Sequence, residues 1–400
     1  MKILHTSDWH LGHRLHEQSQ QYEQKEFLEW LIQFVSTVEI DVLLVAGDIF
    51  DTGYPSSQSM ELFYRFLAQL YRNTQCKQVV MTAGNHDAPG TINAPGSFVR
   101  NFDISLIGKA TENIEDEILT FDIEGEKLIV AAVPFLRDRD IRKAIAGENV
   151  HEIENRYKKA LTSHYAEIAT RIDKNNPAFT VAMGHLFAVG GQPTESENRI
   201  YVGGLGDIAA SDFPLVFDYV ALGHLHRPQK VDKKEHIRYS GSPYPLSFSE
   251  AGQVKKVVLI ETNNSALNLI TEIEVPAFRQ LYTINGTMEH CRERLNEISQ
   301  HDNETEPWVE VILNDNQLST SAYSEINEII KELNLKVLKV RNLRKTGQKG
   351  IEQLEAEDRQ LNELKPDDVF KNKCEQEEFN LAENSEILDA FYEILSEING

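Results

Sequence analysis

Short apolar segments alternate with amphipathic segments through the first 275 or so residues, and this alternation constrains the fold more than any other feature. Between the early strand-like segments, apolar residues recur at helical spacing, first over 27–38 and then over 62–70. The strand-like segments are residues 2–7, 41–48, 78–87, 104–108, 127–135, 179–185, 219–224, 255–261 and 267–275. Such a succession is typical of βα units and predicts an α/β domain.

Pro276 closes the last strand of this domain, and the rest of the chain divides in two. We expect a first domain over 1–276, a small α+β domain of β, α, β, α, β order over 277–345, and a linker with a helical tail over 346–400. In the tail, apolar residues at 387, 391, 395 and 398 share one helical face. That face either packs on its own domain or docks on a partner protein, and the pattern leaves both open.

The charge of the chain bears on whether it binds nucleic acid, and its cysteine content bears on which atoms could hold a metal. The formal net charge is −23, which taken alone argues against nucleic acid as a partner. Residues 351–400, however, hold 15 acidic against 4 basic residues, so nearly half of the excess belongs to the tail. Three cysteines stand far apart with no CxxC pair, so any metal must be held by nitrogen and oxygen.

The sequence lacks two signals, one for membrane insertion or export and one for ATP binding. The chain has no apolar leader after Met1 and no run of about 18 apolar residues, so we expect a soluble, cytoplasmic protein without a membrane segment. It also has no GxxxxGK[ST] phosphate-binding loop, so any ATP dependence must come from a partner. The long charged stretch over 136–178 is expected to be a solvated helix.

Polar side chains follow five of the predicted strands. The strand ends read SDWH, GDIFD, GNHD, GH and GHLH, and they supply Asp8, His10, Asp48, Asp51, Asn85, His86, Asp87, His185, His224 and His226. In α/β sheets, ligands bind in the crevice outside the carboxyl ends of the strands. The glycines permit the close backbone approach that lets these loops converge. We therefore expect one site built from all five.

The ligand types indicate a divalent metal centre. Imidazole nitrogen with carboxylate or amide oxygen suits cations of borderline hardness. The candidate ligands are Asp8, His10, Asp48, Asn85, His185, His224 and His226. Seven ligands are too many for one ion, but they fit two ions that share a bridging carboxylate. Two such ions clamp both oxygens of a phosphoryl displacement and lower the pKa of bound water to about 7.

These motifs in this order, together with the spelling TAGNHD, ALGHLHRPQ and YSGSP, resemble the calcineurin-like metallophosphoesterases, and within them the nuclease subunits of SbcCD type. The resemblance implies a metal-dependent DNA nuclease, a 3′–5′ exonuclease on duplex ends and an endonuclease on hairpins, acting in DNA repair, replication and recombination. It implies manganese as the usual metal, with magnesium, iron or zinc as alternatives.

The resemblance also assigns roles to the matching positions. One metal ion is expected on Asp8, His10, Asp48 and His226, and the second on Asp48, Asn85, His185 and His224, with Asp48 bridging. His86 is expected beside the scissile phosphate, where it stabilises the transition state or protonates the leaving oxygen, with Asp87 orienting its ring.

The resemblance further implies architecture and partners. The fold is expected to be a two-sheet αββα core, with residues 277–345 as a capping domain that helps select DNA. The tail is expected to dock on an SbcC-type coiled-coil ATPase, and the phosphoesterase domain is expected to form a homodimer within a heterotetramer.

Two other functions stay open at this point. One is a phosphomonoesterase or cyclic-nucleotide phosphodiesterase of the same superfamily, although such a core does not need the 125 or so residues after Pro276. The other is a non-catalytic scaffold for an ATPase, which the complete ligand set argues against.

The N-terminal segment holds three histidines that we place outside the metal centre. Residues two apart in an extended strand share a face, so Asp8 and His10 are expected to point into one site, while His5 has the opposite parity and is expected in the interior. His13 and His16 follow Gly12, where the strand has ended, and are expected in a loop at the DNA-facing rim.

Overall fold

The computed structural model describes residues 1–111, 113–137, 150–172, 177–194, 197, 208–300, 305–314 and 326–342. Residues Met1–Asn342 belong to one compact unit. The predicted linker and helical tail, residues 346–400, lie outside the described residues. No helix in the described part of the chain is long and apolar enough to span a membrane.

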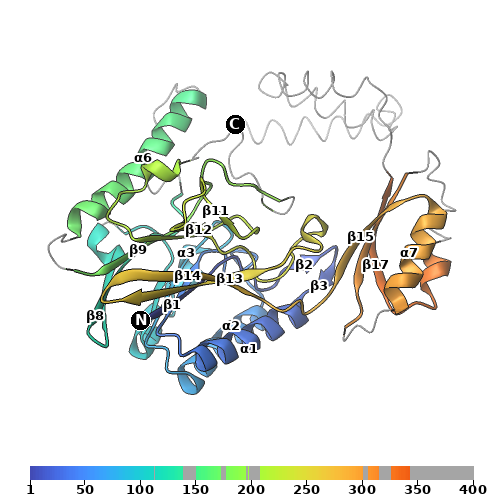
Figure 1. The fold of residues 1–400 in the computed structure, drawn as a ribbon, viewed down its shortest axis with the longest axis horizontal. Coiled ribbons are helices and arrows are strands. Elements are labelled where there is room, and N and C mark those ends of the chain that lie inside the picture. The colour runs from blue at the N-terminus through green and yellow to red at the C-terminus, as the bar shows by residue number, and fades with distance from the viewer. Residues whose placement is uncertain are drawn as a thin grey trace, which may run out of the picture. The chain divides into compact units, whose positions relative to one another are not determined.

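Two six-stranded sheets form the centre of the molecule (Figure 1). The first has the order β14 (Ala266–Glu274), β13 (Lys256–Asn263), β1 (Lys2–Thr6), β4 (Val42–Ala46), β5 (Gln78–Thr82) and β6 (Ile104–Ile107). The second has the order β11 (Gln229–Lys230), β12 (Ile237–Tyr239), β10 (Tyr219–Gly223), β9 (Phe179–His185), β8 (Glu126–Ala132) and β7 (Ile118–Ile123). The strands β1, β4, β5 and β6 are mutually parallel, as are β12, β10, β9 and β8.

Apolar side chains fill the space between the two sheets and cover their outer faces. Val42 and Leu44 of β4 pack in the same cluster as Val181 and Met183 of β9, and all four are buried. The alternate residues of β4, Leu43 and Val45, face the opposite way, toward helices α1 (Gln21–Val38) and α2 (Ser57–Asn73). Helix α6 (Val150–Arg171) packs in a separate cluster with β9 and β10. This arrangement confirms the predicted two-sheet αββα core.

The sequence patterns located the main elements and missed the short ones. Each of the nine predicted strands is present within a few residues of its expected bounds. The edge strand β7 and the short strands β11 and β12 were not predicted. The remaining short elements are β2 (Arg14–Leu15), β3 (Gln18–Ser19), α3 (Pro89–Asn93) and α4 (Gly96–Val99), with 3-10 turns at Arg100–Phe102, Ile114–Glu117, Ala210–Asp212 and Phe248–Glu250. Of the predicted helix over 136–178, residues 150–171 are helical, and 138–149 and 173–176 lie outside the described residues.

The region after Pro276 forms its own small sheet. Its described elements are β15 (Leu281–Gly286), α7 (Met288–Gln300), β16 (Trp308–Leu313) and β17 (Lys336–Asn342), and the three strands are parallel in the order β15, β16, β17. The second predicted helix is described only over 326–330. A small apolar cluster joins this sheet to the rest of the unit through Leu281 and Trp308 on one side and Leu15 and Phe248 on the other.

A buried histidine links the two large sheets and provides a test of their packing. His5 of β1 is fully buried, and its Nδ1 lies 3.0 Å from the hydroxyl oxygen of Tyr219 on β10. Burial lowers the pKa of His5 to about 3, well under the ordinary value of 6.5.

Because the unfolded chain binds this proton more readily, the stabilisation is present above pH 6.5 and is lost as the pH falls toward 3. Between pH 7 and pH 5 we expect this site to remove about 2 kcal/mol of unfolding free energy. His5→Gln should lack that contribution, so urea unfolding at both pH values should show a smaller pH effect in the variant. An equal pH effect in both proteins would contradict the assignment.

Candidate metal centre

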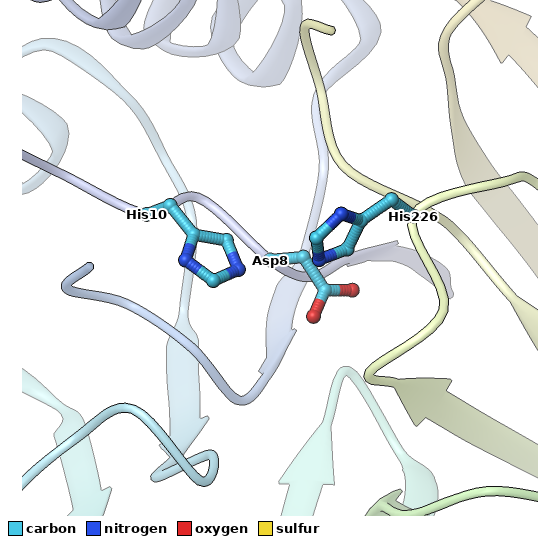
Figure 2. A group of neighbouring side chains, drawn as sticks. All are labelled: Asp8, His10 and His226. Atoms are coloured by element: carbon cyan, nitrogen blue, oxygen red, sulfur yellow. The ribbon is translucent and has the colours of Figure 1, made fainter. Parts of the chain in front are cut away.

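The polar loops expected to converge do so at one end of the two sheets. Asp8 and His10 follow β1, and Asp48 follows β4. His185 is the last residue of β9, and His226 lies just after β10. In the described residues, three groups of side chains bring donor atoms within 4.8 Å of one another: Asp8 with His10 and His226, His10 with Asp48 and His86, and Asp8 with Asp48 and His185. Figure 2 shows the first of these groups.

Asp8 and His10 reach the site for a different reason from the one expected. Strand β1 ends at Thr6, so the alternation of an extended strand does not apply to these residues. Both lie in the left-handed region, with φ of 54° for Asp8 and 43° for His10, as does Asp48 with φ of 48°. Such conformations are uncommon for residues with a Cβ and gather at functional sites. The pairing of Asp8 with His10 was predicted, but its explanation by strand parity was wrong.

Two glycines allow the loops to approach closely. A Cβ built on Gly84 would lie 2.1 Å from Asp48 Oδ1, and one on Gly223 would lie 1.8 Å from the carbonyl oxygen of Ala46. Real Cβ atoms do not approach other atoms so closely. Glycine is therefore required at both strand ends, as the motifs predicted.

Asp48 lies at the centre of the polar contacts. Its Oδ2 is 3.2 Å from His185 Nε2 and 3.5 Å from His10 Nε2, while its Oδ1 accepts the backbone N–H of His86 at 2.9 Å. Burial alone would raise the pKa of Asp48, but the neighbouring His185 and His10 hold it well below its ordinary value. Asp48 therefore remains a carboxylate between two imidazoles that come from different sheets.

The two imidazoles beside Asp48 respond to its charge. Burial lowers the pKa of His10, but the hydrogen bond with Asp51 and the charges of Asp48 and Asp8 outweigh it and raise the pKa to about 9. Burial also lowers the pKa of His185, but the charge of Asp48 outweighs burial and raises this pKa to about 9. Protons on the imidazoles balance the carboxylates, and a bound cation would take over that charge balance.

His224 and Asn85 lie beside His185, and the described part of the chain shows no hydrogen bond from either side chain to Asp48. The Asn85 Oδ1 atom is 2.9 Å from His185 Nε2. The His224 backbone N–H donates to Asp8 Oδ1 at 2.9 Å, and its ring centroid is 5.3 Å from that of His185. His224 belongs to none of the three donor groups found among the described residues. Burial lowers the pKa of His224, with His185 adding to the effect, so its imidazole is neutral and able to act as a ligand.

His86 and Asp87 are arranged differently from the expected pair. The Nδ1–H of His86 donates to the carbonyl oxygen of Asp51, at 2.8 Å. Asp87 instead accepts the backbone N–H groups of Gly84, Ile49 and Phe50, at 2.9, 3.1 and 2.9 Å. The expectation that Asp87 orients the His86 ring is corrected, because its carboxylate oxygens are engaged by these amides, which join the loops after β4 and β5. Burial, with the charge of Asp48, raises the pKa of Asp87 to about 6.

His13 lies closer to the centre than its predicted place on the rim. Its Nδ1 is 3.5 Å from Asp51 Oδ1, and its ring centroid is 6.3 Å from that of His10. Burial lowers the pKa of His13 to about 4, so this ring is neutral. His16 is exposed and stacks on Phe248, at 5.7 Å between ring centroids. Neither residue belongs to a donor group of the described part.

Two charged residues beside the site carry no motif that would have identified them. Glu250 and Lys255 are both buried and form an ion pair of 2.5 Å next to His226. Burial acts to raise the pKa of Glu250, but the charge of Lys255 holds it well below its ordinary value. The only sequence signal is the position of both residues shortly after the YSGSP segment, and it is weak.

The donor set fits divalent cations. It consists of imidazole nitrogen and carboxylate oxygen without sulfur, which suits metals of borderline hardness. The buried His10 Nε2 atom makes no hydrogen bond within the described residues, although a buried polar atom normally has a partner. A bound cation would supply that partner.

Comparisons with known proteins agree with this geometry. A family model described as calcineurin-like phosphoesterase matches residues 1–228, and one described as type 5 capsule protein repressor C-terminal domain matches residues 277–378. The SbcD subunit of the nuclease SbcCD from Escherichia coli K12 is 32% identical over 404 residues, covering 100% of this chain and 99% of that protein.

Proteins of the same name from Bacillus subtilis and Rhodobacter capsulatus are 36% identical over 264 residues and 35% identical over 276 residues. These matches cover 65% and 66% of this chain, and 66% and 67% of the relatives. The predicted resemblance is confirmed: the chain belongs to the calcineurin-like phosphoesterases and, within them, to the family of the SbcD nuclease subunits.

Proposed function

We propose that this protein is the nuclease subunit of an SbcCD-type complex and hydrolyses DNA phosphodiester bonds. The observation that carries the proposal is the convergence of Asp8, His10, Asp48, His185 and His226 in a chain that aligns from end to end with a nuclease subunit. Its activities are those of a 3′–5′ exonuclease on duplex ends and an endonuclease on hairpins and single strands. Its roles lie in DNA repair, replication and recombination.

The metal centre proposed for this reaction holds two ions, with Mn²⁺ as the principal metal and Mg²⁺, Fe²⁺ or Zn²⁺ as alternatives. Asp8, His10, Asp48 and His226 would hold one ion, and Asp48, Asn85, His185 and His224 would hold the other. The central place of Asp48 between His10 and His185 supports its bridging role. When bound, such a pair activates water and stabilises charge on the phosphoryl oxygens.

His86 is proposed to act on the substrate. Its Nδ1–H donates to the Asp51 carbonyl, so the ring orientation is fixed and Nε2 is the nitrogen available for chemistry. A protonated Nε2 can stabilise the phosphoryl oxygens or protonate the leaving oxygen. His86 also shares a donor group with His10 and Asp48, so a ligand role is the alternative that experiment must exclude. Asp87 is proposed to act indirectly, by joining the loops that carry Asp48 and His86.

The domains and partners follow the same family pattern. We propose that residues 1–276 are the nuclease domain, that 277–345 are a capping domain that selects DNA, and that 346–400 include the segment that binds an SbcC-type coiled-coil ATPase. The family match over 277–378 begins where we place the capping domain, which supports that boundary. We further propose a homodimer within a heterotetramer and a cytoplasmic location.

The proposed reaction is tested with the purified chain, Mn²⁺, an SbcC-type ATPase and ATP on a DNA hairpin and a blunt duplex. Hairpin cleavage and 3′–5′ degradation are expected, and excess chelator should abolish both, because the site then lacks its ions. Products are resolved on denaturing gels. Much greater activity on small phosphoesters than on DNA would favour a phosphomonoesterase, and an inert protein would favour the scaffold.

The bridging role of Asp48 predicts unequal effects of two substitutions. Asp48→Asn should lose both ions, because the removed charge is shared between them, whereas Asn85→Ala should weaken chiefly the second ion. Metal content after dialysis against Mn²⁺ measures the difference by elemental analysis. Equal metal content in the two variants would refute this division of the ligands.

The proposed role of His86 predicts a separation of binding from turnover. His86→Gln should lower DNA cleavage by at least about 100-fold, the usual range for loss of an acid–base group, while Mn²⁺ content stays at the wild-type level. Cleavage rates and metal content are measured on the same preparation. Retained cleavage would exclude the role, and loss of one ion would show that His86 is a ligand instead.

A further inference from the structure

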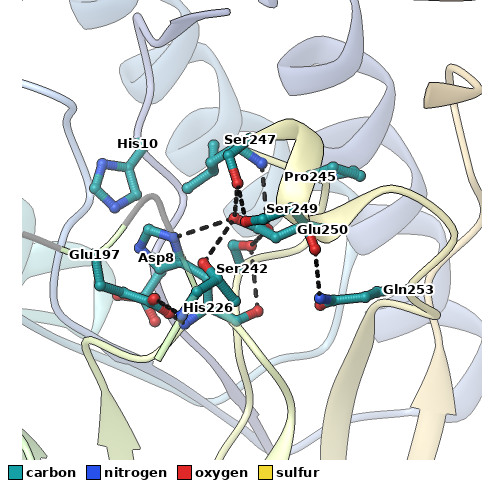
Figure 3. Close-up of polar contacts among 12 residues, drawn as sticks. Asp8, His10, Glu197, His226, Ser242, Pro245, Ser247, Ser249, Glu250 and Gln253 are labelled. Carbon is teal, nitrogen blue, oxygen red and sulfur yellow. Dashed lines mark hydrogen bonds and ion pairs between the residues drawn. The ribbon is translucent and has the colours of Figure 1, made fainter. Parts of the chain in front are cut away.

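A buried ion pair lies directly behind the first donor group. Glu250, in the 3-10 turn Phe248–Glu250, is 0% exposed, and Lys255, just before β13, is 4% exposed. Lys255 Nζ lies 2.5 Å from Glu250 Oε2, and both atoms also contact the Ser242 hydroxyl, at 2.9 and 3.3 Å. Figure 3 shows Glu250 and Ser242 beside Asp8, His10 and His226.

Both members of this pair contact His226. Glu250 Oε1 lies 3.6 Å from His226 Nδ1, and Lys255 Nζ donates to the His226 carbonyl oxygen at 3.1 Å. The backbone N–H of Ser242 donates to the same carbonyl oxygen, also at 3.1 Å. The carboxylate therefore faces the ring of His226, while the ammonium group holds its backbone.

The energetics of such a pair argue for a role beyond stability. Burying two charges is costly, and replacing a buried pair by uncharged groups of similar size is often neutral or stabilising. A carboxylate that faces Nδ1 favours the tautomer with its proton on Nδ1, which leaves the lone pair on Nε2. Figure 2 shows the ring of His226 turned toward Asp8 and His10, the side on which a ligand nitrogen is needed.

We propose that Glu250 and Lys255 are positioning residues that fix the tautomer and orientation of His226 as a metal ligand. The inference rests on the proposed metal role of His226 and adds a residue pair that no motif contains. Glu250 acts on the imidazole, and Lys255 holds the Glu250 carboxylate in place by their ion pair and anchors the His226 carbonyl. Neither residue contacts the reacting atoms.

The test uses the full chain and Mn²⁺ alone, without DNA. In the double variant Glu250→Gln/Lys255→Met, both charges are removed while side-chain size is nearly kept. We expect its Mn²⁺ affinity, measured by isothermal titration calorimetry, to fall about 10- to 100-fold. The thermal unfolding temperature should stay at the wild-type value or rise, because the desolvation cost is relieved. His226→Ala is the reference for loss of the ligand itself.

A matched control comes from a second buried glutamate that pairs with a histidine. Glu117 is 0% exposed, and its Oε2 lies 2.8 Å from His164 Nε2, outside the donor groups. Glu117→Gln should lower the unfolding temperature while Mn²⁺ affinity stays within about twofold of wild type, because this pair has no metal ligand to position. The contrast separates positioning from general stability.

Wild-type Mn²⁺ affinity in the folded double variant would overturn the proposal. If that variant does not fold, Glu250→Asp replaces it, since the shorter carboxylate keeps the charge beside Lys255 but withdraws from His226. We expect a loss of Mn²⁺ affinity of at least about threefold in Glu250→Asp, and unchanged affinity there would also overturn the proposal. A wild-type chain that binds no Mn²⁺ would instead refute the proposed function.

Discussion

The site depends on a buried carboxylate, Asp48, held between imidazoles that come from opposite sheets. A buried charge without partners is costly, so Asp48 requires His10 from the loop after β1 and His185 from the end of β9 to stay in place. Its other oxygen accepts the backbone N–H of His86 after β5. One side chain thus connects the ends of four strands, and the two sheets must pack in one register for these contacts to form.

Sequence patterns predicted the scaffold because burial imposes periodicity on it. The central strands β4 and β9 are nearly continuous apolar runs, and α1 and α2 repeat apolar residues at helical spacing, so these elements leave a readable signal. The loops leave no such signal. Asp8 and His10 lie in left-handed backbone conformations that any extrapolation of strand β1 misses. The motifs identified the residues, but the backbone geometry that joins them had to come from the structure.

The supporting residues were beyond sequence reasoning for a related reason. Asp87 is adjacent to His86 in the chain, which suggested a pair, yet its carboxylate accepts three backbone N–H groups from two loops. Glu250 lies 24 residues after His226, and only the fold brings it to the imidazole. Sequence adjacency therefore suggested a contact of Asp87 with the His86 ring that does not form, and sequence distance gave no sign of the contact between Glu250 and His226. Side-chain partners depend on where the strands end in the fold.

The negative charge of the chain affects DNA binding differently when cations at the site are considered. A net charge of −23 opposes the approach of a polyanion, and the carboxylates of Asp8, Asp48 and Asp51 lie at the proposed position of the phosphodiester. Divalent cations at this centre would be the largest local charges and would reverse the sign of the field there. The carboxylates of the centre would thus favour DNA binding indirectly, because they would hold the cations that attract the phosphodiester.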